Sequence, residues 1–261
     1  MNQLLLSAAV SASFIAVYAY QDGVLPCGDG DRYTSGVRQP YPFHRRFCGW
    51  PKRTLQVVSI GCLFYLGAMM GDWRRTALLM SLPGAWFIAT HPTTVDAPSM
   101  LLAWLSSGFI HDQPVLSVAL SLLAGFIHER GPVFAALYSW SPWPLLGLLA
   151  VGWWRKPART DGDLLVGRGV IRSIAAHRQY VDFLDWRVNL LGLRSLPLLG
   201  AWYGLPLPAW AALVVANGSR IIGSDGARFL FWGAPAVVCS LPDDIPSWVI
   251  AVHVLTFRRL I

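Results

Sequence analysis

Side chains that could act as acids, bases or phosphate ligands are concentrated near the N-terminus, in the stretch GDGDRYTSGVRQPYPFHRRFCGWPKR. Asp29 and Asp31 could take a proton from an attacking hydroxyl group, because a positioned carboxylate is an effective general base. Three arginines of the same stretch could bind a phosphate through paired N–H contacts: Arg38, Arg45 and Arg46. The composition is equally typical of a solvated loop rich in turn-forming Gly, Asp and Pro, so both interpretations stay open.

Two further groups of ionisable residues stand beside apolar segments in the middle of the chain. Asp96 opens the apolar run DAPSMLLAWL, where an aspartate is often only the N-cap of a helix. His128, Glu129 and Arg130 follow another apolar run, and Glu129 is the only glutamate in the chain. Ionisable groups beside apolar spans are costly and are therefore functional candidates. A Glu–Arg pair that only compensates its own charge is the alternative for the second group.

The composition indicates that these groups belong to a membrane protein. The 261 residues are 54% hydrophobic and 13% charged, whereas a soluble domain carries about 25% charged residues. The chain also has 13 tryptophans, a residue that favours the boundary between membrane and water. The formal net charge of +7 therefore favours lipid headgroups or a phosphate-bearing lipid over nucleic acid as the partner. The first apolar segment has no basic residue before it, so we expect a retained span and not a signal peptide.

The apolar segments predict an all-α, polytopic transmembrane helical bundle that forms a single integral membrane domain over residues 1–261. A span needs about 20 apolar residues, and packed multi-span proteins also use shorter ones, so we expect about ten spans, within a range of about 8–12. The expected spans are 3–20, 55–71, 77–90, 99–111, 115–128, 132–153, 188–204, 207–222, 226–241 and 246–258. Residues 162–187 alternate apolar and basic positions at helical spacing, which predicts an interfacial amphipathic helix.

Basic residues in short connections predict the orientation of the bundle. With the N-terminus in the cytoplasm, Arg74–Arg75 and Arg258–Arg259 fall inside, whereas Asp243–Asp244 and the polar loop 22–54 fall outside. The loop itself carries six basic residues, so either the topology is reversed or these residues have a function outside, and we favour the second. The same count puts Asp96 and Glu129 on the outer face with Asp29. It puts a fourth charged group, Asp225 and Arg228 in GSDGARFLFWGAP, on the inner face.

The order of these features resembles a known family. A first span is followed by DGDRY, then by PYPFHRRFCGWP, then by an aspartate after the third span and a charged cluster after the fifth. This order is similar to that of the C-type (GT-C) superfamily of polytopic membrane glycosyltransferases, which take sugars from polyprenyl-phosphate carriers, and the chain resembles a small bacterial-type member. DGDRY is similar to the Asp-Glu-x-x-Tyr/Phe pattern of protein O-mannosyltransferases and aminoarabinose transferases, although Gly30 replaces the second acid. GSDGARFLFWGAP resembles a Gly-x-Asp-x-x-Arg…Pro segment of small bacterial members.

The resemblance implies a reaction and a set of site residues. It maps the catalytic general base onto Asp29, with Asp31 as the competing position, for transfer of a sugar to an acceptor hydroxyl with inversion at the anomeric carbon. Asp96 would orient the acceptor or help to hold a divalent ion. The substrate-binding residues would be Tyr33, Arg38, Arg45, Arg46, His128, Glu129, Arg130, Asp225 and Arg228.

We expect no obligatory cofactor or metal, although a divalent metal is allowed for, because two isolated aspartates are a weak signal for a hard cation. The expected partners are a polyprenyl-phosphate-linked sugar donor, a glycan, lipid or protein acceptor and membrane lipids, with no nucleic acid. The expected location is a bacterial inner or plasma membrane. The alternative function is a non-enzymatic transporter, flippase or assembly subunit for lipid-linked glycans, which would place charges at mid-span depth. Cys27 and Cys48 are either a disulfide pair or two loop thiols.

Overall fold

The computed structural model describes residues 2–22, 52–91, 95–149, 193–219 and 230–255. Every regular element in these ranges is a helix, and the ranges contain no strand, which confirms the expected all-α class for this part of the chain. Most of the polar loop 22–54 and the whole amphipathic segment 162–187 lie outside the described residues.

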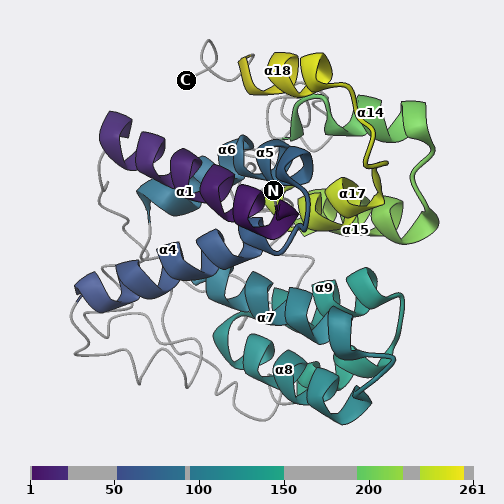
Figure 1. Ribbon diagram of the computed structural model, residues 1–261. Coiled ribbons are helices and arrows are strands. Elements are labelled where there is room, and N and C mark those ends of the chain that lie inside the picture. The colour runs from purple at the N-terminus through teal and green to yellow at the C-terminus, as the bar shows by residue number, and fades with distance from the viewer. Residues whose placement is uncertain (1, 23–51, 92–94, 150–192, 220–229, 256–261) are drawn as a thin grey trace, which may run out of the picture.

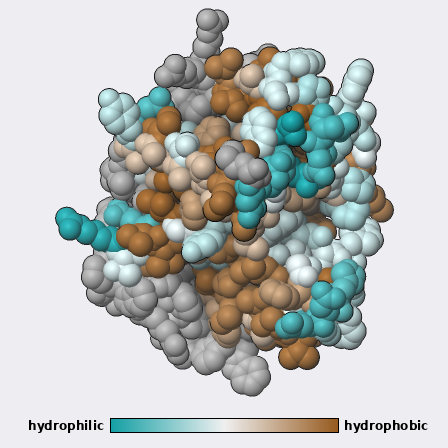
Figure 2. Space-filling view, viewed as in Figure 1, coloured by the Kyte–Doolittle hydropathy of each residue, from teal (hydrophilic) through white to brown (hydrophobic). Residues whose placement is uncertain are grey.

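Helix α1, Gln3–Asp22, is the one described helix that is long and apolar enough to cross a membrane, over Gln3–Gln21. It packs beside α4, Lys52–Ala68 (Figure 1). A small polar residue lies at this contact, where the Ser11 hydroxyl of α1 donates to the Phe64 carbonyl of α4 at 3.1 Å. Hydrophobic side chains cover much of the face that α1 occupies, with hydrophilic ones gathered toward its edges (Figure 2).

The expectation of ten continuous spans is not confirmed, because most described helices are much shorter than a bilayer is thick. At 1.5 Å per residue a 14-residue helix is about 21 Å long, against about 30 Å of hydrocarbon. The bounds are α5 Trp73–Met80, α6 Pro83–Thr90, α7 Asp96–Phe109, α8 Pro114–Ile127, α9 Arg130–Ser139, the 3₁₀ turn η1 Trp143–Leu146, α14 Leu196–Tyr203, α15 Leu207–Gly218, α17 Ala234–Ser240 and α18 Ser247–Leu255.

Proline and local capping explain where several of these helices begin and end. The expected span 77–90 is divided between α5 and α6, because α5 ends at the C-cap Ser81 and Pro83 begins a new helix. Proline has no N–H and is therefore favoured in the first turn. The expected span 132–153 is interrupted at Trp140, which takes the left-handed conformation with φ 49° and ends α9. The rule that one apolar run is one helix fails at these positions.

Helices α7 and α8 form a hairpin of two equally long helices, each of 14 residues. Buried serines join them: the Ser106 hydroxyl donates to the Ser117 carbonyl at 2.8 Å, and the Ser117 hydroxyl donates to the Ser106 carbonyl at 2.7 Å. Nearer the open end, the Ser99 hydroxyl donates to the Ala124 carbonyl at 3.0 Å. Because the helices match in length and run in opposite directions, the end of α8 returns the chain to the beginning of α7.

Helix α9 packs on this hairpin through a glycine. A Cβ atom added at Gly131 would lie 2.6 Å from the Cβ of Ala124 and 2.6 Å from the hydroxyl oxygen of Ser99. Backbone contact through small residues is the usual way in which helices pack closely where apolar burial gives little driving force. The close approach fixes the start of α9 against the start of α7 and the end of α8.

The second half of the bundle joins the first through charged residues next to α5. Arg75 forms an ion pair with Asp243 at 2.9 Å and donates to the Leu241 carbonyl at 2.7 Å, while Arg74 donates to the Asp243 carbonyl at 2.9 Å. The orientation expected from sequence puts these arginines and Asp243 on opposite faces. The contact shows that they lie at the same end of the bundle, so that part of the expected orientation is wrong.

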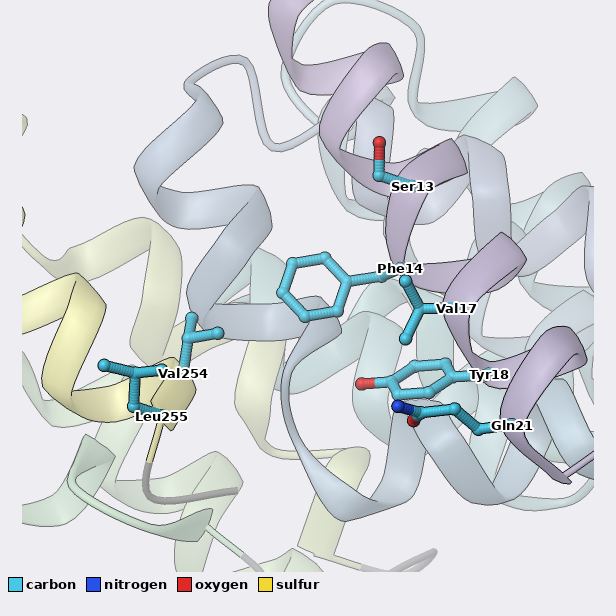
Figure 3. A pocket seen from close by; sticks show the side chains of 7 residues that line it. All are labelled: Ser13, Phe14, Val17, Tyr18, Gln21, Val254 and Leu255. Atoms are coloured by element: carbon cyan, nitrogen blue, oxygen red, sulfur yellow. The ribbon is translucent and has the colours of Figure 1, made fainter. Parts of the chain in front are cut away.

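Helix α18 runs in the same direction as α1 (Figure 1). One hollow of about 280 Å³ is lined by the end of α1, Tyr18 and Gln21, and by the end of α18, Val254 and Leu255 (Figure 3). An adjoining hollow of about 460 Å³ is lined by earlier residues of both helices, including Val10 and Ser247. The end of α18 therefore lies beside the end of α1. In the expected orientation the last span would run the other way and place the two ends on opposite faces.

We expect Gly131→Ala to destabilise the protein by about 1–3 kcal/mol, the usual cost of overpacking. The matched control is Gly108→Ala in α7, where an added Cβ meets nothing within 4 Å and alanine favours the helix. The measurement is chemical unfolding in detergent micelles, followed by helical circular dichroism. Equal effects of the two substitutions would contradict the packing described for α9.

The parallel arrangement of α1 and α18 predicts a cross-linking pattern. In a background with all four cysteines replaced by serine, cysteines at Gln21 and Leu255 should be joined by a short bis-maleimide. The matched pair at Gln21 and Ser247 should not react, because Ser247 lies at the other end of α18, about 12 Å further along its axis. Cross-linking of the second pair and not of the first would restore the orientation expected from sequence.

Candidate functional site

Asp96 is buried at the N-terminal end of α7, with 1% of its surface exposed. It is the first residue of the helix, and the N-cap position belongs to Val95. A carboxylate in the first turn is favoured by the partial positive charge of a helix N-terminus. Asp72 offers a contrast within the same chain, because it is the N-cap of α5 and accepts from the backbone N–H of Arg74 at 2.8 Å. Simple capping therefore describes Asp72 and not Asp96.

A tryptophan from the far end of the chain donates a hydrogen bond to Asp96. The indole N–H of Trp232, just before α17, lies 2.9 Å from Asp96 Oδ1, and Trp232 has no exposed surface. An indole nitrogen can only donate, so the Asp96 oxygen is the acceptor. This bond joins positions 136 residues apart in sequence.

The His128–Arg130 group lies at the same place because the α7–α8 hairpin returns the chain there. The His128 ring lies 5.6 Å from the Trp232 ring and is buried. Its Nδ1 lies 3.4 Å from a carboxylate oxygen of Glu129 and accepts from the backbone N–H of Arg130 at 3.2 Å. His128 therefore links Trp232 to both Glu129 and Arg130.

Aromatic side chains of α9 hold Trp232 in place. The Phe134 ring lies 5.2 Å from the Trp232 ring at an interplanar angle of 40°. One turn later on α9, the Tyr138 hydroxyl donates to the Trp232 carbonyl, and the Tyr138 ring makes an edge contact with Trp104 of α7. Both the side chain and the backbone of Trp232 are therefore fixed by the three-helix unit α7–α9.

The structure thus brings together two of the groups that the sequence predicts as site residues: Asp96, and His128 with Glu129 and Arg130. The remaining predicted site residues lie outside the described ranges: Asp29, Asp31, Tyr33, Arg38, Arg45, Arg46, Asp225 and Arg228. We call the assembled group the Asp96 cluster, meaning Asp96, His128, Glu129, Arg130 and Trp232.

The direction of α17 also differs from the direction expected from sequence. The sequence predicts that residues 217–235 lie on the inner face, away from Asp96. Trp232, within that range, contacts Asp96, whereas Asp243, after α17, contacts Arg75. Helix α17 therefore runs from the Asp96 end of the bundle to the Arg75 end, the reverse of the expected direction. Because Trp232 contacts Asp96, Trp232 lies at the Asp96 end of the bundle and not at the opposite end.

The Asp96 cluster combines a buried carboxylate, an imidazole, a second carboxylate and a guanidinium. These groups can orient a hydroxyl, exchange a proton or hold an anion. In the described part of the chain, no group of three or more His, Cys, Asp or Glu side chains is arranged so that it could hold a metal ion. Neither hollow between α1 and α18 is lined by a residue of the cluster.

Trp232 is the member of the cluster that sequence reasoning missed. It lies in the stretch GSDGARFLFWGAP, where Asp225 and Arg228 were selected as candidates because they are charged. Tryptophan is common throughout this chain and so did not stand out. The sequence did carry one signal. Counting spans put this stretch on the face opposite to Asp29, Asp96 and Glu129, and such a conflict indicates that a span was miscounted.

Comparison with known proteins yields no relative: no protein-family model, no curated protein and no solved structure matches the chain.

We expect Asp96→Ala to destabilise the protein by about 1–3 kcal/mol, because it leaves the buried indole N–H of Trp232 without this acceptor. Asp96→Asn is the matched control, since its side-chain carbonyl can still accept the bond, and it should cost less. Chemical unfolding of both purified variants measures the difference. An equal loss of stability in the two variants would contradict a stabilising role for this hydrogen bond.

Proposed function

We propose that the chain is a multi-pass membrane glycosyltransferase that moves a sugar from a polyprenyl-phosphate carrier to an acceptor hydroxyl on the extracytoplasmic face. The observation that carries the proposal is that Asp96 and His128 both contact Trp232, with Glu129 beside His128. Asp96, His128 and Glu129 belong to two of the four charged groups whose order resembles the GT-C superfamily, and these two groups are well separated in sequence.

The membrane part of the proposal rests on surface and packing. Helix α1 has the length and apolarity of a span, and large apolar side chains such as Leu5, Tyr20 and Trp202 are well exposed. Buried serines and glycines at helix contacts, as between α7 and α8, are typical of membrane bundles. Broken helices such as α5–α6 are tolerated at membrane depth where neighbouring helices cover them.

In the proposed reaction Asp29 takes the proton from the acceptor hydroxyl as its oxygen attacks the anomeric carbon. The bond from that carbon to the phosphate oxygen breaks, and its electron pair leaves with the polyprenyl phosphate, so the configuration inverts. The departing phosphate carries its own negative charge and needs cationic stabilisation, not a proton. Arg45 and Arg46 are the residues proposed for it.

Asp96 has the proposed role of orienting the acceptor. In the sequence, helix α1 leads directly into the segment that contains Asp29. The direction of α17 supports the proposal further, because Trp232, from the late stretch that resembles the family, contacts Asp96.

The test compares Asp29→Asn, Asp31→Asn and Asp96→Asn in purified, folded protein, with a labelled polyprenyl-phosphate sugar as donor. Loss of a general base costs about 10²–10⁴-fold in rate, so we expect that loss in Asp29→Asn and wild-type turnover in Asp31→Asn. The reverse result would move the base to Asp31. Full turnover in all three variants would contradict the proposed glycosyltransferase mechanism. Translocation of the intact donor without a new glycosidic bond would favour the transporter or flippase alternative.

A further inference from the structure

The burial of the Asp96 carboxylate is energetically costly, whatever the protein's function. A carboxylate with 1% exposure has lost nearly all of its water, and an ionised group in that state is stable only if donors replace the water. The α7 N-terminus supplies one favourable term. The Trp232 indole N–H, 2.9 Å from Oδ1, supplies a directed one.

Trp232 is unusually well fixed as a donor. Its ring contacts the rings of Phe134 and His128, with centroids 5.2 Å and 5.6 Å away, and its carbonyl accepts from the Tyr138 hydroxyl. Groups whose own positions are locked by packing hold a reactive side chain more accurately than mobile ones. The fixed ring can therefore hold the Asp96 carboxylate in one orientation.

We propose that Trp232 is a positioning residue that fixes the orientation of the Asp96 carboxylate and keeps it ionised. This inference rests on the proposed function for its catalytic consequence, but not for its structural content. His128 lies beside the Trp232 ring, and Glu129 and Arg130 both contact His128, so these are the charged or titratable groups that the described contacts place next to the Asp96–Trp232 hydrogen bond.

The decisive variant is Trp232→Phe, which keeps an aromatic ring to contact Phe134 and His128 and removes the N–H. The carboxyl carbons of ¹³C-labelled aspartates in the full chain are titrated by NMR, and Asp96→Asn identifies the Asp96 signal. We expect Trp232→Phe to move the Asp96 titration to higher pH by about one to two units, the effect of losing a hydrogen bond to a charged group. Trp104→Phe is the matched control on α7 and should leave that titration unmoved. An Asp96 titration that is unchanged in folded Trp232→Phe overturns the proposal.

A second measurement keeps Trp232 in place and therefore does not depend on how well Trp232→Phe folds. Among the indole N–H signals of the wild-type protein, one should exchange slowly with solvent and shift in Asp96→Asn. No shifted indole signal in Asp96→Asn would also overturn the proposal.

Transfer kinetics separate this inference from the proposed function. If both hold, Trp232→Phe lowers kcat by about 10- to 10²-fold with little change in the KM for the donor, and moves the acidic limb of the pH–rate profile to higher pH. If the Asp96 titration moves but the wild-type protein transfers no sugar, the proposed function fails and the positioning role stands. If the wild-type protein transfers sugar and Trp232→Phe keeps its full rate and pH profile, the positioning role fails alone.

Discussion

The hydrogen bond between Trp232 and Asp96 is the contact on which the arrangement of the bundle depends most. It joins the start of α7 to the segment before α17, and both partners are almost fully buried. A buried polar pair of this kind permits few alternative arrangements, because breaking it leaves the buried indole N–H without this acceptor. Once it is formed, α17 must run away from Asp96, and the Arg75–Asp243 ion pair at its far side fixes the opposite end.

Close packing by small residues makes that bond reachable. The α7–α8 hairpin depends on serine hydroxyls that bond across the interface, and α9 approaches through Gly131. These contacts replace the large apolar side chains that would hold a soluble hairpin together. The result is a compact three-helix unit whose open end presents Asp96 and His128, with the aromatic residues of α9 aligned to receive Trp232.

Sequence predicted the helical class and the candidate residues of this unit, but not the contacts that assemble them. Long apolar runs identified most helices, because a strand with one face in water would alternate apolar and polar residues and these runs do not. Their ends were missed where proline or a left-handed residue divides a run, as at Pro83 and Trp140. Asp96 and Glu129 could be selected because ionisable groups beside apolar segments are costly. Trp232 could not, since a tryptophan in an apolar chain carries no comparable cost until its partner is known.

The errors in orientation share one physical origin. Counting spans assigns each segment to a face by parity, so one segment that fails to cross reverses every later assignment. The two contradicting contacts, Arg75 with Asp243 and Trp232 with Asp96, both join the first half of the chain to residues after position 229. The directions of α17 and α18 both differ from expectation in the same sense. A single miscounted crossing between Glu129 and Trp232 would account for all of these differences, so they do not require two independent errors. With that crossing removed, Trp232 and Asp96 belong at one end of the bundle, as their hydrogen bond requires.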